Sequence, residues 1–529
     1  MKQVHKRIAA AASALLLCTG MTAAGTPVEA ALRGDALMDG VVSVEDAQFA
    51  LNAYAELVAG KYNAIFPDDA ERADVNGDGA LTAEDAQLIL LYYTANTVAQ
   101  QPTSWHDLMP NAPKAGITDD GDTLTIAFWT NDEVNVMIDQ FMTLHPEYQG
   151  KVKTVLIDTV SYNMSQQLAA KIDSGTDIDL YIAADDWIRQ YKDDPIYSAP
   201  LSELGFTEKD FENCYPYTLT VGKDRSGVQK GVAWQVSPGG YVYRSDLAEK
   251  YLGVKTPAEM QNLVCNWDTF TETAEKLKTV TAGGTAMVAT YADLWQALQF
   301  SSVTLTRSAD NHVKILDDFK PTANLIKMYH DNGYITDADQ WSDQWYKVGQ
   351  DNSALGYFFS SWCLGNRAML YNAEGGEEGE TYGKYNITEG PCSWYWGGNW
   401  IMLSPYCNNK TMAHDFIYDF VVNPETMKAF SENYAKAYGS PAFVNNQKVM
   451  SSMNIPNPLL GGQSEFAVLH NNIKSLDYGG IYKDQDPYLK MELETRMLSR
   501  YLNQGESYAE SLANSKYDIQ WQYPEYTFD

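Results

Sequence analysis

The apolar residues between positions 34 and 93 repeat one helical pattern twice. In each copy, four apolar side chains stand at i, i+3, i+4 and i+7: Ala47, Ala50, Leu51 and Tyr54, then Ala86, Ile89, Leu90 and Tyr93. Residues with this spacing share one face of an α-helix. The pattern therefore predicts two amphipathic helices whose positions differ by 39 residues.

Beyond residue 121 the pattern changes to short apolar runs separated by helical stretches. Strands are predicted at Asp122–Trp129, Lys151–Asp158 and Asp177–Ala184, with helices at Val134–Leu144 and Tyr162–Asp173 between them. This β-α-β-α-β order is typical of an open parallel α/β sheet. The intervening residues 99–121, which contain Pro102, Pro110 and Pro113, are predicted to be an interdomain linker.

Each of the two predicted helices follows a loop rich in oxygen ligands. The segments GDALMDGVVSVEDAQFALNAY (34–54) and ADVNGDGALTAEDAQLILLYY (73–93) align, and a calcium loop takes ligands from positions 1, 3, 5, 7, 9 and 12. These are Asp74, Asn76, Asp78, the Ala80 carbonyl, Thr82 and Asp85 in the second loop, and Asp35, Asp39, the Val41 carbonyl, Ser43 and Asp46 in the first. Leu37 stands at the third position of the first loop, so we expect two Ca²⁺ sites with the first one weaker.

No helix is predicted before either loop, so each unit is half of an EF-hand. This duplicated loop-and-helix unit, Leu32 to Thr97, resembles a dockerin, the calcium module that binds cohesin domains of cellulosome scaffolds. The resemblance implies a cohesin partner, contacted through Val44-Glu45 and Ala83-Glu84, where the best-known dockerins have Ser-Thr. An ordinary calcium-stabilised EF-hand pair is the alternative. Calcium is expected to stabilise a helix pair that would be marginal at this size.

Six segments of the remaining chain can be compared with a known protein family: LTIAFWTNDEVNVMIDQFMTLHPEYQGKVKTV, YNMSQQLAAKIDSGTDIDLYIAADDW, KGVAWQVSPGGYVYRSDLAEKYLG, NWDTFTETAEKLK, YWGGNWIMLSP and AHDFIYDFVVNPETMKAF. In order and spacing they resemble the extracellular solute-binding proteins of carbohydrate ABC transporters, family 1. The resemblance implies a two-lobed, periplasmic-binding-protein-like α/β fold with an interlobe cleft. It also implies an oligosaccharide ligand and an ABC permease as a further partner.

Aromatic and polar residues at the predicted strand ends and crossovers are the candidates for this cleft. Sugars offer apolar faces to flat rings and hydroxyls to polar side chains. The candidate ligand-binding residues are Trp129, Asp185, Asp186, Trp187, Trp234, Trp362, Trp394, Tyr395, Trp396 and Asn399. Trp129 and Trp234 are equally consistent with the core, and Asp185 and Asp186 with a helix cap.

Composition narrows these expectations. The formal net charge of −31 argues against nucleic acid and anionic membranes as partners, because both would repel the chain. A basic start, the short apolar stretch Ile8–Leu17 and the sequence Val28-Glu29-Ala30 predict a cleaved secretion signal over residues 1–30, with a lipid anchor at Cys18 as the alternative. The other cysteines form no C-x-x-C pair and the histidines are scattered, which argues against a disulfide framework or a zinc site.

Together these features predict a secreted, non-catalytic oligosaccharide-binding protein. The dockerin (31–98) would hold it at the cell surface on a cohesin, and residues 122–529 would bind the sugar. Two alternatives stay open. A dockerin-borne glycoside hydrolase needs two carboxylates about 5–10 Å apart, for which Glu374, Glu377 and Glu378 are weak candidates. A scaffold or adhesion role needs no sugar site.

Overall fold

The computed structural model describes most of the chain. The described residues are 33–37, 41–61, 72–129, 131–157, 164–185, 187–300, 305–307, 312–365, 367–438, 441–474, 476, 489, 491–522 and 526–529. The predicted secretion signal with Cys18 lies outside these ranges, as do Asp39 and Asp186. Within the described ranges, no helix is long and apolar enough to cross a membrane.

The small module near the N-terminus is a pair of packed helices, α2 (Val44–Val58) and α4 (Ala83–Tyr93), and α4 continues into the π-helical turn η1 (Thr94–Val98). The two helices predicted from the apolar spacing are therefore confirmed. Their core is separate from that of the large domain and consists mainly of small and branched side chains: Ala36, Ala47, Ala50, Ala73, Val75, Ala86, Leu88, Ile89 and Met109. Such a small core leaves little stability to the module by itself.

The first lobe of the large domain contains a five-stranded sheet in the order β2-β1-β3-β11-β4. Its strands are β1 (Leu124–Phe128), β2 (Val152–Leu156), β3 (Leu180–Ala184), β4 (Gly231–Ala233) and β11 (Asn399–Leu403). β1 pairs parallel with β2 and β3, which confirms the predicted β-α-β-α-β start, whereas β11 runs antiparallel to β3 and β4. The helices of this lobe are α6 (Asn131–Leu144), α7 (Met164–Asp173), α8 (Ile188–Lys192), α9 (Pro216–Gly222), α17 (Lys410–Ile417) and α18 (Pro424–Tyr438).

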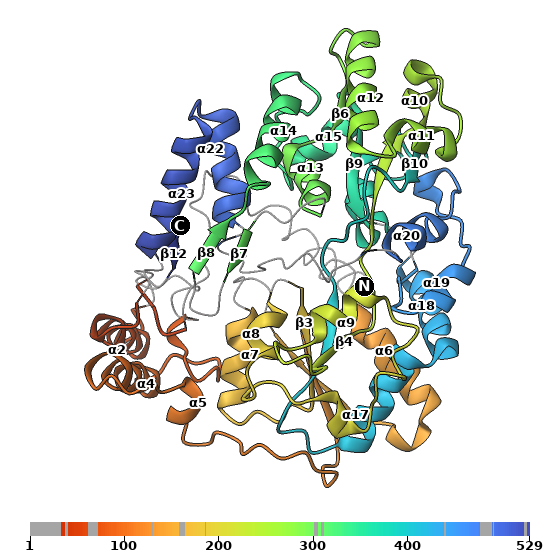
Figure 1. Ribbon diagram of the computed structural model, residues 1–529. Helices are drawn as coiled ribbons and strands as arrows, with labels where there is room; N and C mark the ends of the chain where they lie inside the picture. Colours follow the sequence, from red (N-terminus) through yellow and green to blue (C-terminus); the bar gives the residue numbers. More distant parts are fainter. Residues whose placement is uncertain are drawn as a thin grey trace.

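The second lobe contains a four-stranded sheet in the order β10-β5-β9-β6. Its strands are β5 (Gly239–Arg244), β6 (Ala286–Val288), β9 (Ala354–Ser360) and β10 (Tyr385–Thr388). Its helices are α10 (Ser245–Leu252), α11 (Pro257–Val264), α12 (Trp267–Val280), α13 (Tyr291–Leu298), α14 (Phe319–Asp331), α15 (Asp343–Gln350) and α16 (Met369–Ala373). In Figure 1 this lobe lies above the first, and the two sheets are separate bodies joined by crossing segments.

The last part of the chain forms two groups of helices, which lie on opposite sides of the molecule in Figure 1. α19 (Gln447–Ser452) and α20 (Phe466–Ile473) contact each other, and α20 also contacts β5. A third sheet, β12-β8-β7, joins β7 (Leu305–Arg307) and β8 (His312–Ile315) to the C-terminal β12 (Thr527–Phe528). Beside it stand α22 (Met497–Asn503) and α23 (Tyr508–Gln522), as Figure 1 shows.

The segment 99–121, predicted to be a linker, is packed against both parts of the protein. Its short helix α5 (Trp105–Leu108) stacks Trp105 on Tyr92 of α4, with ring centroids 4.2 Å apart. Further along, the main-chain nitrogen of Gly116 donates to the Pro405 carbonyl (2.8 Å) and that of Thr118 to the Cys407 carbonyl (2.9 Å). The segment therefore connects the small module to the first lobe and is packed against both.

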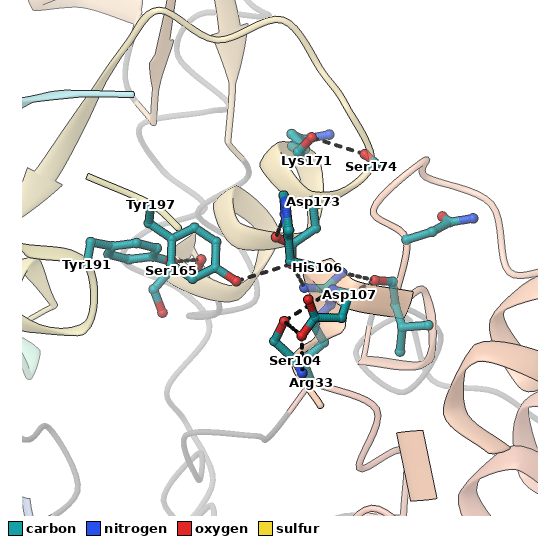
Figure 2. A network of polar contacts seen from close by, with 12 residues as sticks. Arg33, Ser104, His106, Asp107, Ser165, Lys171, Asp173, Ser174, Tyr191 and Tyr197 are labelled. Atoms are coloured by element: carbon teal, nitrogen blue, oxygen red, sulfur yellow. Dashed lines mark hydrogen bonds and ion pairs between the residues drawn. The ribbon is translucent and has the colours of Figure 1, made fainter. Parts of the chain in front are cut away.

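Asp173, the last residue of α7, attaches the small module to the first lobe (Figure 2). Its fully buried carboxylate forms an ion pair with Arg33 at 2.6 Å, lies 3.2 Å from Nδ1 of His106 and accepts a hydrogen bond from the Tyr197 hydroxyl (3.2 Å). The Arg33 guanidinium also donates through Nε to the carbonyl of Val75 (2.7 Å). A buried charge needs such partners, so this network fixes the position of the module.

Asp173→Ala would leave the Arg33 guanidinium buried without its counter-charge, which typically costs about 3–5 kcal/mol. We expect a lower melting temperature and faster proteolysis within residues 99–121, measured by calorimetry and limited trypsin digestion. As a control, Asp331→Ala breaks the exposed pair of Lys327 and Asp331 (3.0 Å) and should cost no more than about 0.5 kcal/mol. Equal effects of the two substitutions would contradict the role assigned to Asp173.

Glu374, one of the carboxylates considered for a hydrolase, lies inside the second lobe at the end of α16 and is fully buried. Its Oε1 accepts a hydrogen bond from the main chain of Gly383 (3.1 Å), and its Oε2 has no hydrogen-bond partner within the described part of the protein. Burial raises the pKa of Glu374 to about 8. Glu377 and Glu378 are exposed on the following loop, so these three carboxylates form no catalytic pair facing a common site.

Glu374 should make the stability of the protein depend on pH. Its pKa rises from an ordinary 4.5 to about 8 on folding, so the free energy of unfolding should fall as the pH rises through this interval. Glu374→Gln keeps a carbonyl acceptor and removes the titration, so we expect a smaller decline, measured by urea unfolding across the same interval. Glu377→Gln, on the exposed loop, should behave like the parent protein; a parent-like slope in Glu374→Gln would refute the assignment.

Candidate ligand-binding site and calcium loops

Two crossing segments and the end of one strand meet where the lobes join. The chain passes from β4 to β5 through residues 234–238 and from β10 to β11 through residues 389–398. The buried Ser237 carbonyl accepts hydrogen bonds from the main-chain nitrogen of Trp396 (3.0 Å) and from the Ser360 hydroxyl at the end of β9 (2.9 Å). The junction therefore holds residues from both lobes in fixed register.

Three tryptophans gather at this junction, of which Trp341 and Trp362 are exposed and Trp396 is partly buried. Trp362 donates through Nε1 to the carbonyl of Trp396 (2.8 Å), and their ring centroids lie 4.8 Å apart. Trp341 lies 5.5 Å from Trp396 and 6.2 Å from Trp362, nearly parallel to the latter at 12°. Trp341 is 47% and Trp362 39% exposed. Large apolar rings grouped at a surface commonly mark a binding site, and indole faces stack well on apolar ligand faces.

The first lobe adds polar groups next to this tryptophan cluster (Trp341, Trp362 and Trp396). Asp185 follows β3, where its carboxylate accepts a hydrogen bond from the Tyr395 hydroxyl (3.3 Å) and its main-chain nitrogen donates to the Gly398 carbonyl (3.1 Å). Asn399 opens β11 beside Ala184 and is partly exposed. Asp185, Tyr395 and Asn399 thus lie at one end of the sheet, and their contact with a ligand stays a prediction.

Trp129 lies at the end of β1, where it is partly exposed. Its ring meets the edge of Trp187 at 5.7 Å, and Trp187 is itself buried. The buried Trp187 ring therefore packs against Trp129 and limits its movement. Trp129 stays a candidate ligand contact.

Three predicted ligand contacts are corrected by the structure, because Trp187, Trp234 and Trp394 are buried. Trp234 packs edge-on against Phe430 at 5.5 Å. Trp394 covers Gly239 so closely that a Cβ atom there would lie 2.2 Å from the indole. Tyr395 is also buried, and it reaches the candidate site only through its hydroxyl.

Trp341 was not among the candidates taken from the sequence. Its exposure depends on residues brought together by the fold, although the sequence QWSDQW does place two tryptophans four positions apart. Only the first of them is exposed, and Trp345 is fully buried. This difference could not be read from their spacing.

At the described positions of the two calcium-type loops, the last carboxylate accepts the same pair of main-chain hydrogen bonds. In the second, the Asp85 carboxylate accepts from the main chain of Asn76 (3.4 Å) and Thr82 (2.8 Å). In the first, the Asp46 carboxylate accepts from Leu37 (3.0 Å) and Ser43 (2.8 Å). The repeat seen in the sequence therefore extends to the hydrogen bonds of this last carboxylate.

The second loop gathers oxygen atoms and negative charge. Burial, and then the nearby carboxylates of Asp85 and Asp78, raise the pKa of Asp74 to about 6. Oxygen donors and converging negative charge suit a hard cation such as Ca²⁺. Among the described residues, no three His, Cys, Asp or Glu side chains alone form a preformed metal site, so Asn76 and main-chain oxygens would be needed as well. In the first loop Leu37 presents only carbon at the equivalent position.

The residues predicted to contact a partner are at the surface. Val44 and Glu45 at the start of α2, and Ala83 and Glu84 at the start of α4, are all exposed. They remain available while the module is attached to the first lobe. Their role in partner binding stays a prediction.

Comparison with known proteins gives a consistent result for the large domain. The sequence profile of the family "Bacterial extracellular solute-binding protein" matches residues 136–448. A solved structure described as an extracellular solute-binding protein family 1 superimposes with a TM-score of 0.64 at 17% identity, covering 76% of this chain and 100% of that one. The search of curated proteins found no match.

Two further solved structures show the same fold. The sugar-binding protein MalE from the phytopathogen Xanthomonas citri superimposes with a TM-score of 0.59 at 11% identity, covering 76% of this chain and 97% of that one. The galacto-N-biose-/lacto-N-biose I-binding protein of the ABC transporter from Bifidobacterium longum, in complex with lacto-N-biose, gives 0.55 at 14% identity, covering 76% and 98%.

Proposed function

The chain belongs to the bacterial extracellular solute-binding proteins, and on this premise we propose that its two-lobed domain binds an oligosaccharide without changing it chemically. The observation that carries the proposal is the tryptophan cluster at the junction of the lobes. Two of its three neighbouring indoles, Trp341 and Trp362, are exposed, and apolar rings grouped at a surface commonly mark a binding site.

The composition of the junction suits a sugar better than a purely apolar ligand. Indole rings stack on the C–H faces of sugar rings, and carboxylate and amide side chains bind hydroxyls. Asp185 and Asn399 supply such groups beside the cluster. A polar group left unpaired in a closed site costs about 1–3 kcal/mol, which would let these residues discriminate between sugars.

The described carboxylates give less support to the alternative of a glycoside hydrolase. Glu374 is enclosed in the second lobe, and Glu377 and Glu378 stand on a surface loop. Hydrolysis needs two carboxylates on either side of one bond. Binding without turnover is therefore the function that the site supports best.

A panel of oligosaccharides tested by titration calorimetry, followed by chromatography of the recovered sugar, would test the proposal. We expect binding with the sugar recovered intact. Trp396→Ala should weaken binding by about tenfold or more, equivalent to about 1.4 kcal/mol, because it removes the central ring of the cluster. Trp521→Ala removes a tryptophan on α23 that is 69% exposed and should leave affinity unchanged. Cleaved sugar, or equal affinities for both variants, would overturn the proposal.

We further propose that the small module is a dockerin that attaches the secreted protein to a cohesin at the cell surface, where the large domain would capture sugars and deliver them to an ABC permease. Two features support this. The loops repeat in sequence and in hydrogen-bond pattern, and the four predicted contact residues are exposed on the docked module. Calcium at Asp74, Asn76, Asp78 and Asp85 would stabilise the helix pair.

The two loops should differ in their calcium affinity. Asp74→Ala removes the first ligand of the complete second loop, and Asp35→Ala removes the equivalent ligand of the loop interrupted by Leu37. We expect Asp74→Ala to cause the larger loss of calcium binding, measured by titration calorimetry, and the larger fall in melting temperature. Cohesin binding should disappear in chelator. Equal losses from the two substitutions would contradict the predicted asymmetry.

A further inference from the structure

A buried carboxylate is hydrogen-bonded to the segment that carries Trp341. Asp293, in the first turn of α13, is fully buried and accepts two side-chain hydrogen bonds. One comes from Nε2 of Gln340 (2.9 Å) and the other from Nε1 of Trp345 (2.8 Å). Both donors belong to one short segment, residues 340–345, and Trp341 stands between them.

Trp341 has a backbone conformation that needs support. Its φ angle is +72°, in the left-handed region that costs a bulky L-residue on the order of 1–3 kcal/mol. Such a conformation persists only where the surroundings enforce it. The two hydrogen bonds to Asp293, one on each side of Trp341 in the sequence, supply that enforcement, and the Trp345 ring packs against Trp341 at 5.5 Å.

We propose that Asp293 is a positioning residue, whose carboxylate clamps the segment 340–345 and so holds the exposed Trp341 indole in register with Trp362 and Trp396. The effect of Asp293 on sugar affinity rests on the proposed function, but its effect on the position of Trp341 can be observed without sugar. Trp341 would then join Trp362, which follows β9, as a second-lobe member of the three-ring cluster, and Asp293 would act on the ligand only through Trp341.

The clamp should respond to pH. Burial raises the pKa of Asp293 to about 7, and the titratable groups that interact with it, Tyr357 of β9 and Cys363 after it, have pKa values raised by burial as well and stay neutral. Both bonds to Asp293 are donated to it, so the ionised carboxylate accepts both well. Protonation turns one oxygen into a hydroxyl, a weaker acceptor, which loosens one side of the clamp.

The contribution of Asp293 to global stability and the order of Trp341 therefore change with pH in opposite directions. Because folding raises the pKa of Asp293, its contribution to stability falls as the pH rises from about 4 to about 7. Over the same interval the ionised fraction, and with it the order of Trp341, increases. If sugar affinity merely followed the stability of the protein, it would fall as the pH rises, whereas the clamp predicts that it increases.

The test compares the parent protein with Asp293→Asn, Gln340→Ala and Trp341→Ala between pH 5.5 and 8.5. Near-ultraviolet circular dichroism reports the coupling between the indoles in the absence of sugar, and calorimetry reports affinity for the oligosaccharide found in the panel. We expect the parent signal and affinity to increase with a midpoint near pH 7, and Asp293→Asn to abolish both changes. Trp341→Ala should weaken binding by about tenfold at pH 8, and Gln340→Ala should give an intermediate effect.

Two controls keep the outcomes distinct. Glu465→Gln removes another buried carboxyl, whose pKa burial raises to about 7 but which bonds to Asn457 instead of the cluster, so it should retain the parent pH profile. If Asp293→Asn fails to fold, Gln340→Ala still tests the clamp, because it removes one donor and keeps the buried carboxylate. An Asp293→Asn protein with the parent pH profile, or a parent signal independent of pH, overturns the clamp while leaving sugar binding intact. An indole signal that titrates without any sugar binding supports the clamp and refutes the proposed function.

Discussion

The hydrogen-bonded junction between the two sheets is the constraint on which the rest of the structure depends. Buried main-chain groups must find partners, and here the Ser237 carbonyl satisfies donors from the second crossing segment and from the end of β9. Three distant parts of the chain are thereby held together. The same parts carry Trp362, Trp396 and Gly398, so the framework that joins the lobes also arranges the candidate ligand-binding site.

Buried acids serve two purposes in this protein, according to whether a cation accompanies them. Asp173 is paired with Arg33 and stabilises the attachment of the small module. Glu374 and Asp293 are buried without a salt bridge within the described structure, and burial raises the pKa of each. The ion pair of Asp173 with Arg33 fixes where the small module sits on the first lobe. The unpaired carboxyls make the stability of the second lobe depend on pH.

The small module is an integral part of the molecule instead of a freely tethered tag. Arg33 donates to the carbonyl of Val75 within the second calcium-type loop, and Gly77 of that loop leaves no room for a side chain against Ala170 of α7. The loop with the more complete ligand set is thus in contact with the first lobe. Its shape and the attachment of the module therefore depend on each other.

The sequence by itself determined the features that arise from neighbouring residues: the two helices, their loops and the β-α-β-α-β start, because periodicity and capping act over a few positions. It could not separate the partly exposed Trp396 from Trp394 in the core, since packing against Gly239 and Phe358 encloses the latter. Nor could it reveal Trp341, whose exposed position is set by Asp293, 47 residues before Gln340. Tertiary structure decided which side chains reach the candidate ligand-binding site, because burial depends on neighbours that local sequence does not specify.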